Sequence, residues 1–385
     1  MGKTLLTASE VNLPCDGLSL ILIFFFLKVH NPRTPLLEGL KATDWLGALI
    51  VTGGTVMFSL GLEFGGVTYP WSSATVSCLI SHGVSTFLIF LLFQWKIAKH
   101  PIMPLRLFNH RSNAAVFIVV IAQGMAFIST AYFLPFYFQA VLGATPIQSG
   151  LWVLLLCGAQ ALTSIATGAY IQKGGNYCGV IWFGAFFMTL GFGLFIDLQP
   201  YHSWTRITVY QVLVSLGIGP LFQPPIIALQ AHLGEKDVAT GTSTISFLRM
   251  LSAGVSVVVG QVIFQSQIQK PASYAAMQRA GISNIDTDTL AGGSTVSATF
   301  LIQTLTPEQQ VVVRGVITSS LQKLWIFYAA ISFVGLLASL GVQKMVLSTE
   351  HVDARTGLET GTSSPMGFEK NEMGGSTKHL EHVFH

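Results

Sequence analysis

The stretch "LGIGPLFQPPIIALQ", residues 216–230, places helix-breaking residues inside otherwise apolar sequence. Its breakers and amides are Gly217, Gly219, Pro220, Gln223, Pro224, Pro225 and Gln230. A proline removes one helix hydrogen bond and bends the helix, and a glycine lets a neighbouring helix approach closely. Inside a bilayer, the carbonyl groups freed by such a bend need partners in the protein or in water. The stretch therefore predicts a bent membrane helix that packs against other helices.

The composition of the whole chain is that of a membrane protein. Of its 385 residues, 51% are hydrophobic and 10% are charged, and the mean hydropathy is +0.60. Soluble domains carry about 25% charged residues. The net charge of +3 is small and scattered, which argues against nucleic acid as a partner. The four cysteines lie far apart without metal-binding spacing, so we expect free thiols and no metal site.

Nine segments are apolar enough to cross a bilayer, for which a helix needs about 20 residues. They are 11–27, 45–65, 75–95, 114–139, 147–170, 177–198, 207–230, 241–264 and 324–346. The sequence therefore predicts an all-α, polytopic membrane helix bundle of about nine spans. Thr306-Pro307-Glu308-Gln309 has the pattern of a helix start and predicts a short amphipathic helix, 307–322, before the last span.

Basic residues in the short loops predict the orientation of the spans. Segments 28–44 and 96–113 contain lysines and arginines, whereas 66–74 and 140–146 contain none. We therefore expect the first two segments to face the cytoplasm and the other two to face outside. Alternation of the spans then places a long loop, 265–323, outside, together with the N-terminus.

Polar side chains inside the spans are candidates for the lining of a substrate cavity. They are Gln123, Tyr132, Tyr137, Gln160, Gln211 and Gln223. Amides are costly when they face lipid, so they are expected to turn inward, and a lining of amides and phenols suits an amphipathic organic ligand. The alternative is that the amides bond across tightly packed helices, as in any membrane bundle. The residues alone leave both interpretations open.

Arg249 is an arginine well inside a predicted span, 241–264. An arginine at such a depth is costly and usually marks function or a paired group. We expect it to form a gate or a packing contact on the cytoplasmic side, with snorkelling toward water as the alternative. The same role, gate or packing, is predicted for Gly217, Gly219, Pro220, Pro224 and Pro225.

The motifs of common enzymes do not occur in the sequence. There is no HExxH, no GxSxG, no Walker phosphate loop and no GxGxxG after a strand. We therefore predict neither an enzyme nor a cofactor site, and no ATP-binding domain to drive transport.

Five longer stretches carry a family resemblance. They are "VNLPCDGLSLILIFFFLK" (11–28), "HPIMPLRLFNHRSNAA" (100–115), "YFLPFYFQAVLGATPIQSGLWVLLL" (132–156), "GIGPLFQPPIIALQ" (217–230) and "VATGTSTISFLRMLSAGVSVVVGQVIF" (238–264). Together they resemble the fourteen-span drug:proton antiporter branch of the major facilitator superfamily, especially fungal toxin and multidrug efflux pumps. The resemblance implies proton-coupled, alternating-access export of hydrophobic or amphipathic small molecules. It also implies the plasma membrane as location, with the vacuolar membrane as the alternative.

The resemblance also assigns the parts of the chain. It implies a last span of the N-terminal half in 1–30, a linker with two extra spans in 31–100, and a C-terminal six-span bundle in 101–347. The polar segment 348–385 is expected to be a disordered cytoplasmic tail.

The first five spans of the family pattern have no counterpart in the sequence, so an N-terminally truncated transporter is expected. A non-transporting paralogue or a gene-model fragment is the alternative. Because spans 114–346 hold no carboxylate at mid-membrane depth, a proton-coupling acid would have to come from elsewhere.

Overall fold

The computed structural model describes residues 16–23, 25, 43–65, 69–98, 101–282, 290 and 295–345. The chain divides into two units, one made of residues 1–35 and 353–385 and the other of residues 36–352. In the first unit, residues 16–23 are helical, so the predicted span 11–27 is described only in part. The predicted tail, 348–385, lies outside the described residues. The second unit contains all the helices discussed below.

Within the described part of the second unit, eight helical segments are long and apolar enough to cross a membrane. In chain order, their helices are α3 (Trp45–Phe64), α4 (Ala74–Lys96), α5 (Arg111–Phe136) with the π-helix η2 (Tyr137–Val141), α6 (Pro146–Gly174), α7 (Tyr177–Phe195), α8 (Trp204–Ile218) with the 3-10 turn η3 (Gly219–Leu221) and α9 (Pro224–Gln230), α10 (Glu235–Ile268) and α14 (Pro307–Ser339). Three short helices complete the description, namely η1 (Leu105–Asn109), α11 (Pro271–Arg279) and α13 (Thr295–Gln303). These helices confirm the predicted all-α membrane bundle.

The helix starts follow local sequence signals. Thr145 forms a capping box with Gln148, in which each side chain bonds the other residue's backbone N–H (3.3 and 3.0 Å). The start at Thr306 has the same pattern, and the Gln309 side chain accepts the Thr306 N–H at 3.2 Å.

The last span differs from the prediction, because α14 runs without interruption from Pro307 to Ser339. The expected amphipathic helix 307–322 is therefore the first part of this helix, and the connection after α10 is 269–306 instead of 265–323. No proline follows Pro307 within α14, and Val313, Ile317, Leu321 and Leu324 are all buried along it. These buried side chains recur at helical spacing through both parts, so a single continuous helix buries all of them against its neighbours.

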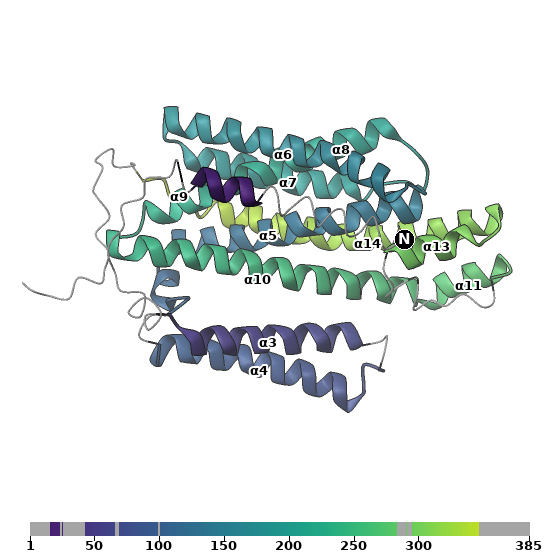
Figure 1. Ribbon diagram of the computed structural model, residues 1–385, viewed down its shortest axis with the longest axis horizontal. Coiled ribbons are helices and arrows are strands. Elements are labelled where there is room, and N and C mark those ends of the chain that lie inside the picture. Colours follow the sequence, from purple (N-terminus) through teal and green to yellow (C-terminus); the bar gives the residue numbers. More distant parts are fainter. Residues whose placement is uncertain are drawn as a thin grey trace, which may run out of the picture. The chain divides into compact units, whose positions relative to one another are not determined.

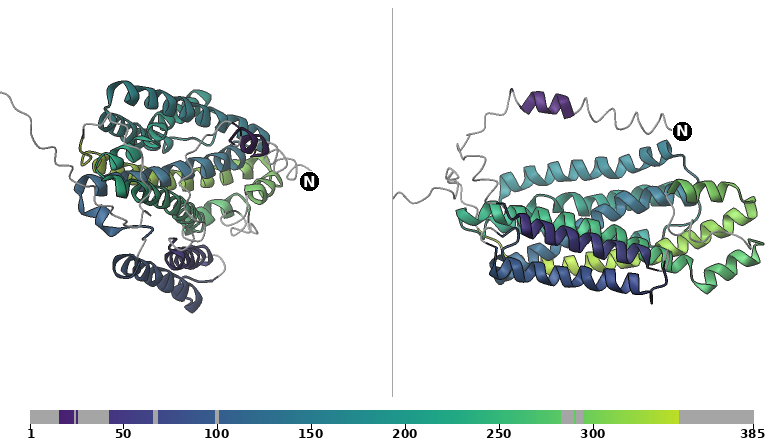
Figure 2. Two further views of the ribbon diagram at one scale, coloured as in Figure 1. Left: turned by 60° about the vertical axis from the view of Figure 1, so that its left-hand side comes forward. Right: turned by 60° about the horizontal axis from the view of Figure 1, so that its bottom comes forward.

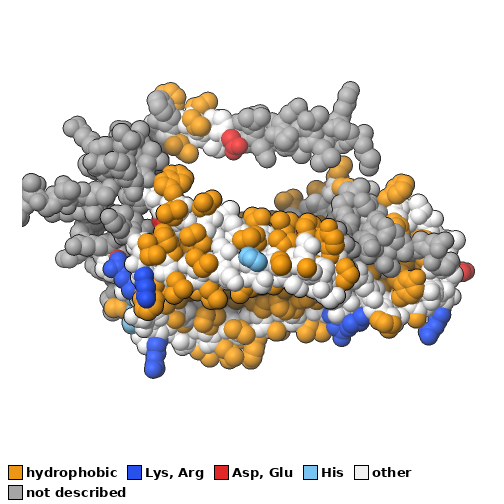
Figure 3. Space-filling view, turned by 90° about the horizontal axis from the view of Figure 1, so that it is seen from below, with side chains coloured by type: hydrophobic (Ala, Val, Ile, Leu, Met, Phe, Trp, Pro, Cys, Tyr) orange, Lys and Arg blue, Asp and Glu red, His pale blue; other side chains and the backbone are white. Residues whose placement is uncertain are grey.

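The helices of the second unit pack around α5 and α14 (Figure 1). Helix α5 contacts α10 on one side and α14 on another, and α14 also contacts α7. Helix α8 joins α7 to α6. Figure 2 shows α3 and α4 as a hairpin alongside the bundle, where α3 contacts α10. The face that Figure 3 shows is mostly hydrophobic along its middle, and its lysines and arginines lie toward the two ends of the view, as expected for a surface that faces lipid.

Glycines bring α7 and α8 into close contact. A Cβ atom at Gly217 would overlap the backbone of Met188, and one at Gly191 would lie 2.8 Å from the Val214 Cα. Lipid supplies no hydrophobic drive for helix association, so close packing of this type is a main source of stability in a membrane bundle.

Replacing Gly217 with alanine is therefore expected to destabilise the bundle by about 1–3 kcal/mol, because the added methyl group forces α7 and α8 apart. Gly158→Ala is the matched control, since a Cβ at this helical glycine of α6 would meet nothing within 4 Å. Thermal unfolding of the purified protein in detergent micelles measures both variants. Equal unfolding temperatures for the two variants would contradict the assigned contact.

Candidate functional site

The stretch 216–230 folds as a broken helix. Helix α8 ends at Ile218, the 3-10 turn η3 covers Gly219–Leu221, and α9 begins at Pro224. Pro224 and Pro225 have no N–H, so they cannot donate to the carbonyl groups one turn earlier. Pro220, Pro224 and Pro225 are all buried at the break. The helix is thus interrupted inside the protein, where freed carbonyl groups need other donors.

Hydroxyl groups of α6 supply donors at this break. The Ser164 hydroxyl donates to the Gly219 carbonyl at 2.7 Å, and the Thr163 hydroxyl lies 3.2 Å from the Ser215 carbonyl. These short bonds require a close approach, and a Cβ at Gly219 would lie 2.7 Å from the Gln160 carbonyl oxygen. Gly219 therefore brings α6 near enough for its side chains to satisfy the interrupted backbone.

Arg249 of α10 holds the other side of the break. Its Nη2 donates to the Phe222 carbonyl at 3.0 Å, and its guanidinium lies 5.4 Å from the centre of the Phe222 ring. Ile226 and Ile227 both donate their N–H to the Gln223 carbonyl instead. The half-buried Arg249 thus bonds a carbonyl group inside the protein, and its role as a gate or a packing contact stays a prediction.

A second junction joins α5, α10 and α14 through hydroxyl groups that the sequence analysis did not single out. The Ser256 hydroxyl lies 2.9 Å from the Met125 carbonyl and 3.0 Å from the Tyr328 hydroxyl, which itself donates to the Ser256 carbonyl at 2.8 Å. All three helices meet closely here, because a Cβ at Gly260 would lie 2.5 Å from the Tyr328 hydroxyl. The spacing of Ser252, Ser256 and Gly260, one every four residues, is the sequence signal that indicates this small-residue face.

Three of the predicted cavity residues are buried amides. Gln123 of α5, Gln160 of α6 and Gln211 of α8 are all nearly inaccessible to solvent. Among the described residues, no hydrogen-bond partner exists for either amide atom of Gln123, for Nε2 of Gln160 or for Oε1 of Gln211. Each buried amide therefore keeps unused hydrogen-bonding capacity.

The other three predicted cavity residues have different surroundings. Tyr137 is buried, and its hydroxyl donates to the Gln199 carbonyl at 2.7 Å, which ties the end of α5 to the connection between α7 and α8. Tyr132 is 48% exposed, and Gln223 is exposed at the start of α9. The six residues thus occupy helix contacts, a loop contact and the surface, and a shared cavity for them stays a prediction.

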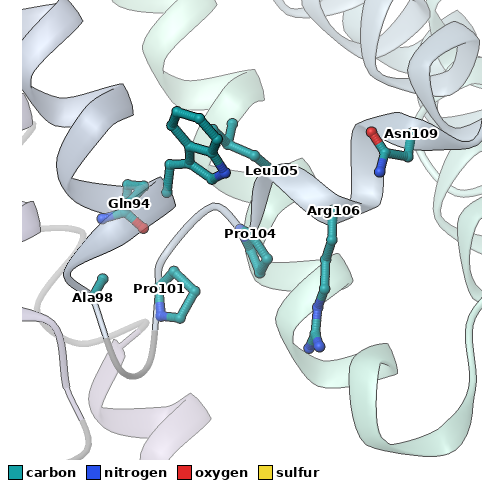
Figure 4. A pocket seen from close by; sticks show the side chains of 8 residues that line it. Gln94, Ala98, Pro101, Pro104, Leu105, Arg106 and Asn109 are labelled. Atoms are coloured by element: carbon teal, nitrogen blue, oxygen red, sulfur yellow. The ribbon is translucent and has the colours of Figure 1, made fainter.

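A cavity of about 430 Å³ lies elsewhere, where α4 ends and the connection to α5 begins (Figure 4). Its lining consists of Gln94, Trp95, Ala98, Pro101, Pro104, Leu105, Arg106 and Asn109. None of the predicted site residues lines it. Within the described ranges, no three His, Cys, Asp or Glu side chains gather as a metal site would require.

Comparison with known proteins identifies related sequences over most of the chain. A family model described as fungal trichothecene efflux pump matches residues 17–152. "Efflux pump dotC" of Dothistroma septosporum is 42% identical over 91% of this chain and 59% of its own length. "MFS-type transporter ppz2" of Metarhizium majus is 39% identical over 90% of this chain and 60% of its own length. An "MFS-type transporter" of Aspergillus terreus is 36% identical over 95% of this chain and 67% of its own length.

The chain spans about three-fifths of the length of the first two of these relatives. The relative from Aspergillus terreus establishes the family, because it is 36% identical and the alignment covers 95% of this chain and 67% of that relative. The chain belongs to the major facilitator superfamily of membrane transporters.

Proposed function

We propose that these helices form part of a pump that exports hydrophobic or amphipathic small molecules by proton-coupled alternating access. The observation that carries the proposal is the set of three buried amides, Gln123, Gln160 and Gln211, which have unbonded polar atoms on three different helices. A buried polar atom without a partner costs about 1–3 kcal/mol. These amides gain partners in a second conformation, in which substrate or water reaches them. In a protein that alternates between two conformations, a buried amide can lack a hydrogen-bond partner in one conformation and gain one in the other.

The substrate class follows from the chemistry of these groups. Neutral amides donate and accept hydrogen bonds but do not select charge, so they suit uncharged or weakly polar organic molecules. The matching family model is described as a fungal trichothecene efflux pump and one relative is named an efflux pump, and these names support export as the direction. Proton coupling and a plasma-membrane location, with the vacuole as alternative, rest on the family resemblance.

A non-transporting membrane protein is the second candidate function. It is favoured by the separation of Tyr132 and Gln223, which lie at the surface, from the buried amides. Expression of residues 1–385 in a pump-deficient yeast separates the two functions. We expect the cells to export a fluorescent hydrophobic dye and an uncoupler of the proton gradient to abolish this export. Protein that reaches the membrane but exports no dye would favour the second function.

Replacement of Gln123 by leucine distinguishes a substrate contact from a packing role. Because the Gln123 amide is buried and unbonded, an apolar side chain of similar size is expected to leave stability unchanged or raise it by about 1 kcal/mol. Export is nevertheless expected to fall severalfold. Dye export and thermal unfolding measure the two effects, and Gln172→Leu at the exposed end of α6 is the control. Undiminished export by Gln123→Leu would remove Gln123 from the transport path.

Arg249→Ala is expected to lower both export and stability. The substitution leaves the Phe222 carbonyl without its donor inside the broken helix, at a cost of about 1–3 kcal/mol. Met250→Ala, which alters the exposed neighbour on the same helix, is expected to change neither quantity. Surface expression, thermal unfolding and dye export are measured together. If Arg249→Ala behaves like Met250→Ala, the bond to Phe222 does not hold the break together.

A further inference from the structure

The cavity at the end of α4 presents donors without acidic groups among its described lining residues. Arg106 is 68% exposed and uses one terminal nitrogen, Nη2, to pair with Asp237. The side-chain N–H groups of Trp95 and Asn109 have no hydrogen-bond partner among the residues that the structure describes. A concave site with a guanidinium, an amide and an indole N–H is suited to a group that carries several acceptor oxygens and negative charge.

The wall of the cavity is rigid. Gln94 is buried, and its amide is fully engaged: Nε2 donates to the Asp44 carboxylate at 2.6 Å and Oε1 accepts the Met103 N–H at 3.2 Å. Pro101 and Pro104 restrict the backbone of the segment that leads from Ala98 to Arg106 (Figure 4). This side of the cavity is therefore preformed, which lowers the entropic cost of binding a ligand.

An apolar track leads from the cavity into the membrane. Leu88, Leu92 and Trp95 are exposed at spacings of four and three residues, so they form one stripe along α4. Lys96 lies next to this stripe, with Nζ 5.1 Å from the centre of the Trp95 ring. A tryptophan and a lysine at the end of a span are typical of the level of the lipid headgroups.

We propose that this cavity binds the phosphate headgroup of an anionic phospholipid. Arg106, Asn109 and the Trp95 indole contact the phosphate oxygens, and an acyl chain lies along Leu92 and Leu88. The basic loops predict that this end of the bundle faces the cytoplasm, where anionic lipids are concentrated. The apolar track is what distinguishes a lipid from a free phosphate ion as the ligand.

The test measures the thermal unfolding of the full chain in detergent micelles during titration with short-chain phosphatidylglycerol. This lipid is expected to raise the unfolding temperature in a saturable manner. Phosphatidylcholine with the same chains is expected to need a concentration roughly fivefold higher, since one basic residue near an anionic headgroup contributes about that factor. Inorganic phosphate is expected to have no effect at the concentrations that saturate with lipid.

Three variants locate the effect. Arg106→Gln is expected to raise the half-saturating concentration of phosphatidylglycerol roughly fivefold. Asp237→Asn breaks the same ion pair but keeps the cation, so binding stays equal or becomes tighter. Arg206→Gln is the matched control, because Arg206 in the first turn of α8 also forms a partly exposed ion pair, with Asp197, and this variant is expected to bind like the unmodified chain. If Arg106→Gln does not fold, Asn109→Ala takes its place, with a weaker binding expected.

Four results would overturn the proposal: equal potency of phosphatidylcholine and phosphatidylglycerol, equal potency of inorganic phosphate, unchanged binding by Arg106→Gln, and equal losses in Arg106→Gln and Arg206→Gln. The second result assigns the cavity to a free anion, and the fourth assigns the effect to overall charge. None of these results bears on export, so the lipid site and the proposed function are tested independently.

Discussion

The bundle depends on one constraint: backbone carbonyl groups released inside a membrane must find donors within the protein. The break between α8 and α9 releases such groups, and two neighbours bond them. Ser164 of α6 bonds the Gly219 carbonyl from one side, and Arg249 of α10 bonds the Phe222 carbonyl from the other. The broken helix is therefore a point of attachment between α6, α8 and α10, and Arg249 of α10 supplies a donor to the Phe222 carbonyl group.

Small residues provide the close approach that these bonds need. Gly219 lets the hydroxyl groups of α6 reach the break, and Gly260 brings α10 against the Tyr328 hydroxyl of α14. In a bilayer the lipid tails are as apolar as the side chains, so close contact and internal hydrogen bonds stabilise the bundle where the hydrophobic effect does not. The peripheral helices differ from this centre. Helix α6 and the hairpin of α3 and α4 expose most of their side chains, which agrees with surfaces that face lipid.

The sequence predicted the helical bundle and eight of its spans well, because length and hydropathy alone decide which segments cross a membrane. It predicted that all the amides turn inward, whereas Gln223 is exposed. A span that is apolar on all sides has no contrast between its faces, so periodicity cannot show that Gln123 is buried and Gln223 exposed. The contact of Tyr137 with the Gln199 carbonyl was equally invisible, because it joins residues far apart in the chain. The sequence does not show the continuity of α14, because an amphipathic start followed by an apolar end resembles two separate helices.

These bonds limit how the protein can change conformation. Ser256 and Tyr328 fasten α5, α10 and α14 to one another, and Arg249 joins α10 to the break after α8. A movement within this group would expose several buried carbonyl groups at once, each at a cost of about 1–3 kcal/mol. A displacement of the group as a single body breaks none of them. The amides without hydrogen-bond partners lie on helices that belong to this body or adjoin it. We therefore expect the access of water or substrate to these amides to change when other parts of the protein move along the surface of the body. The proposed export by alternating access is compatible with such a body, because its internal hydrogen bonds persist while its surroundings change.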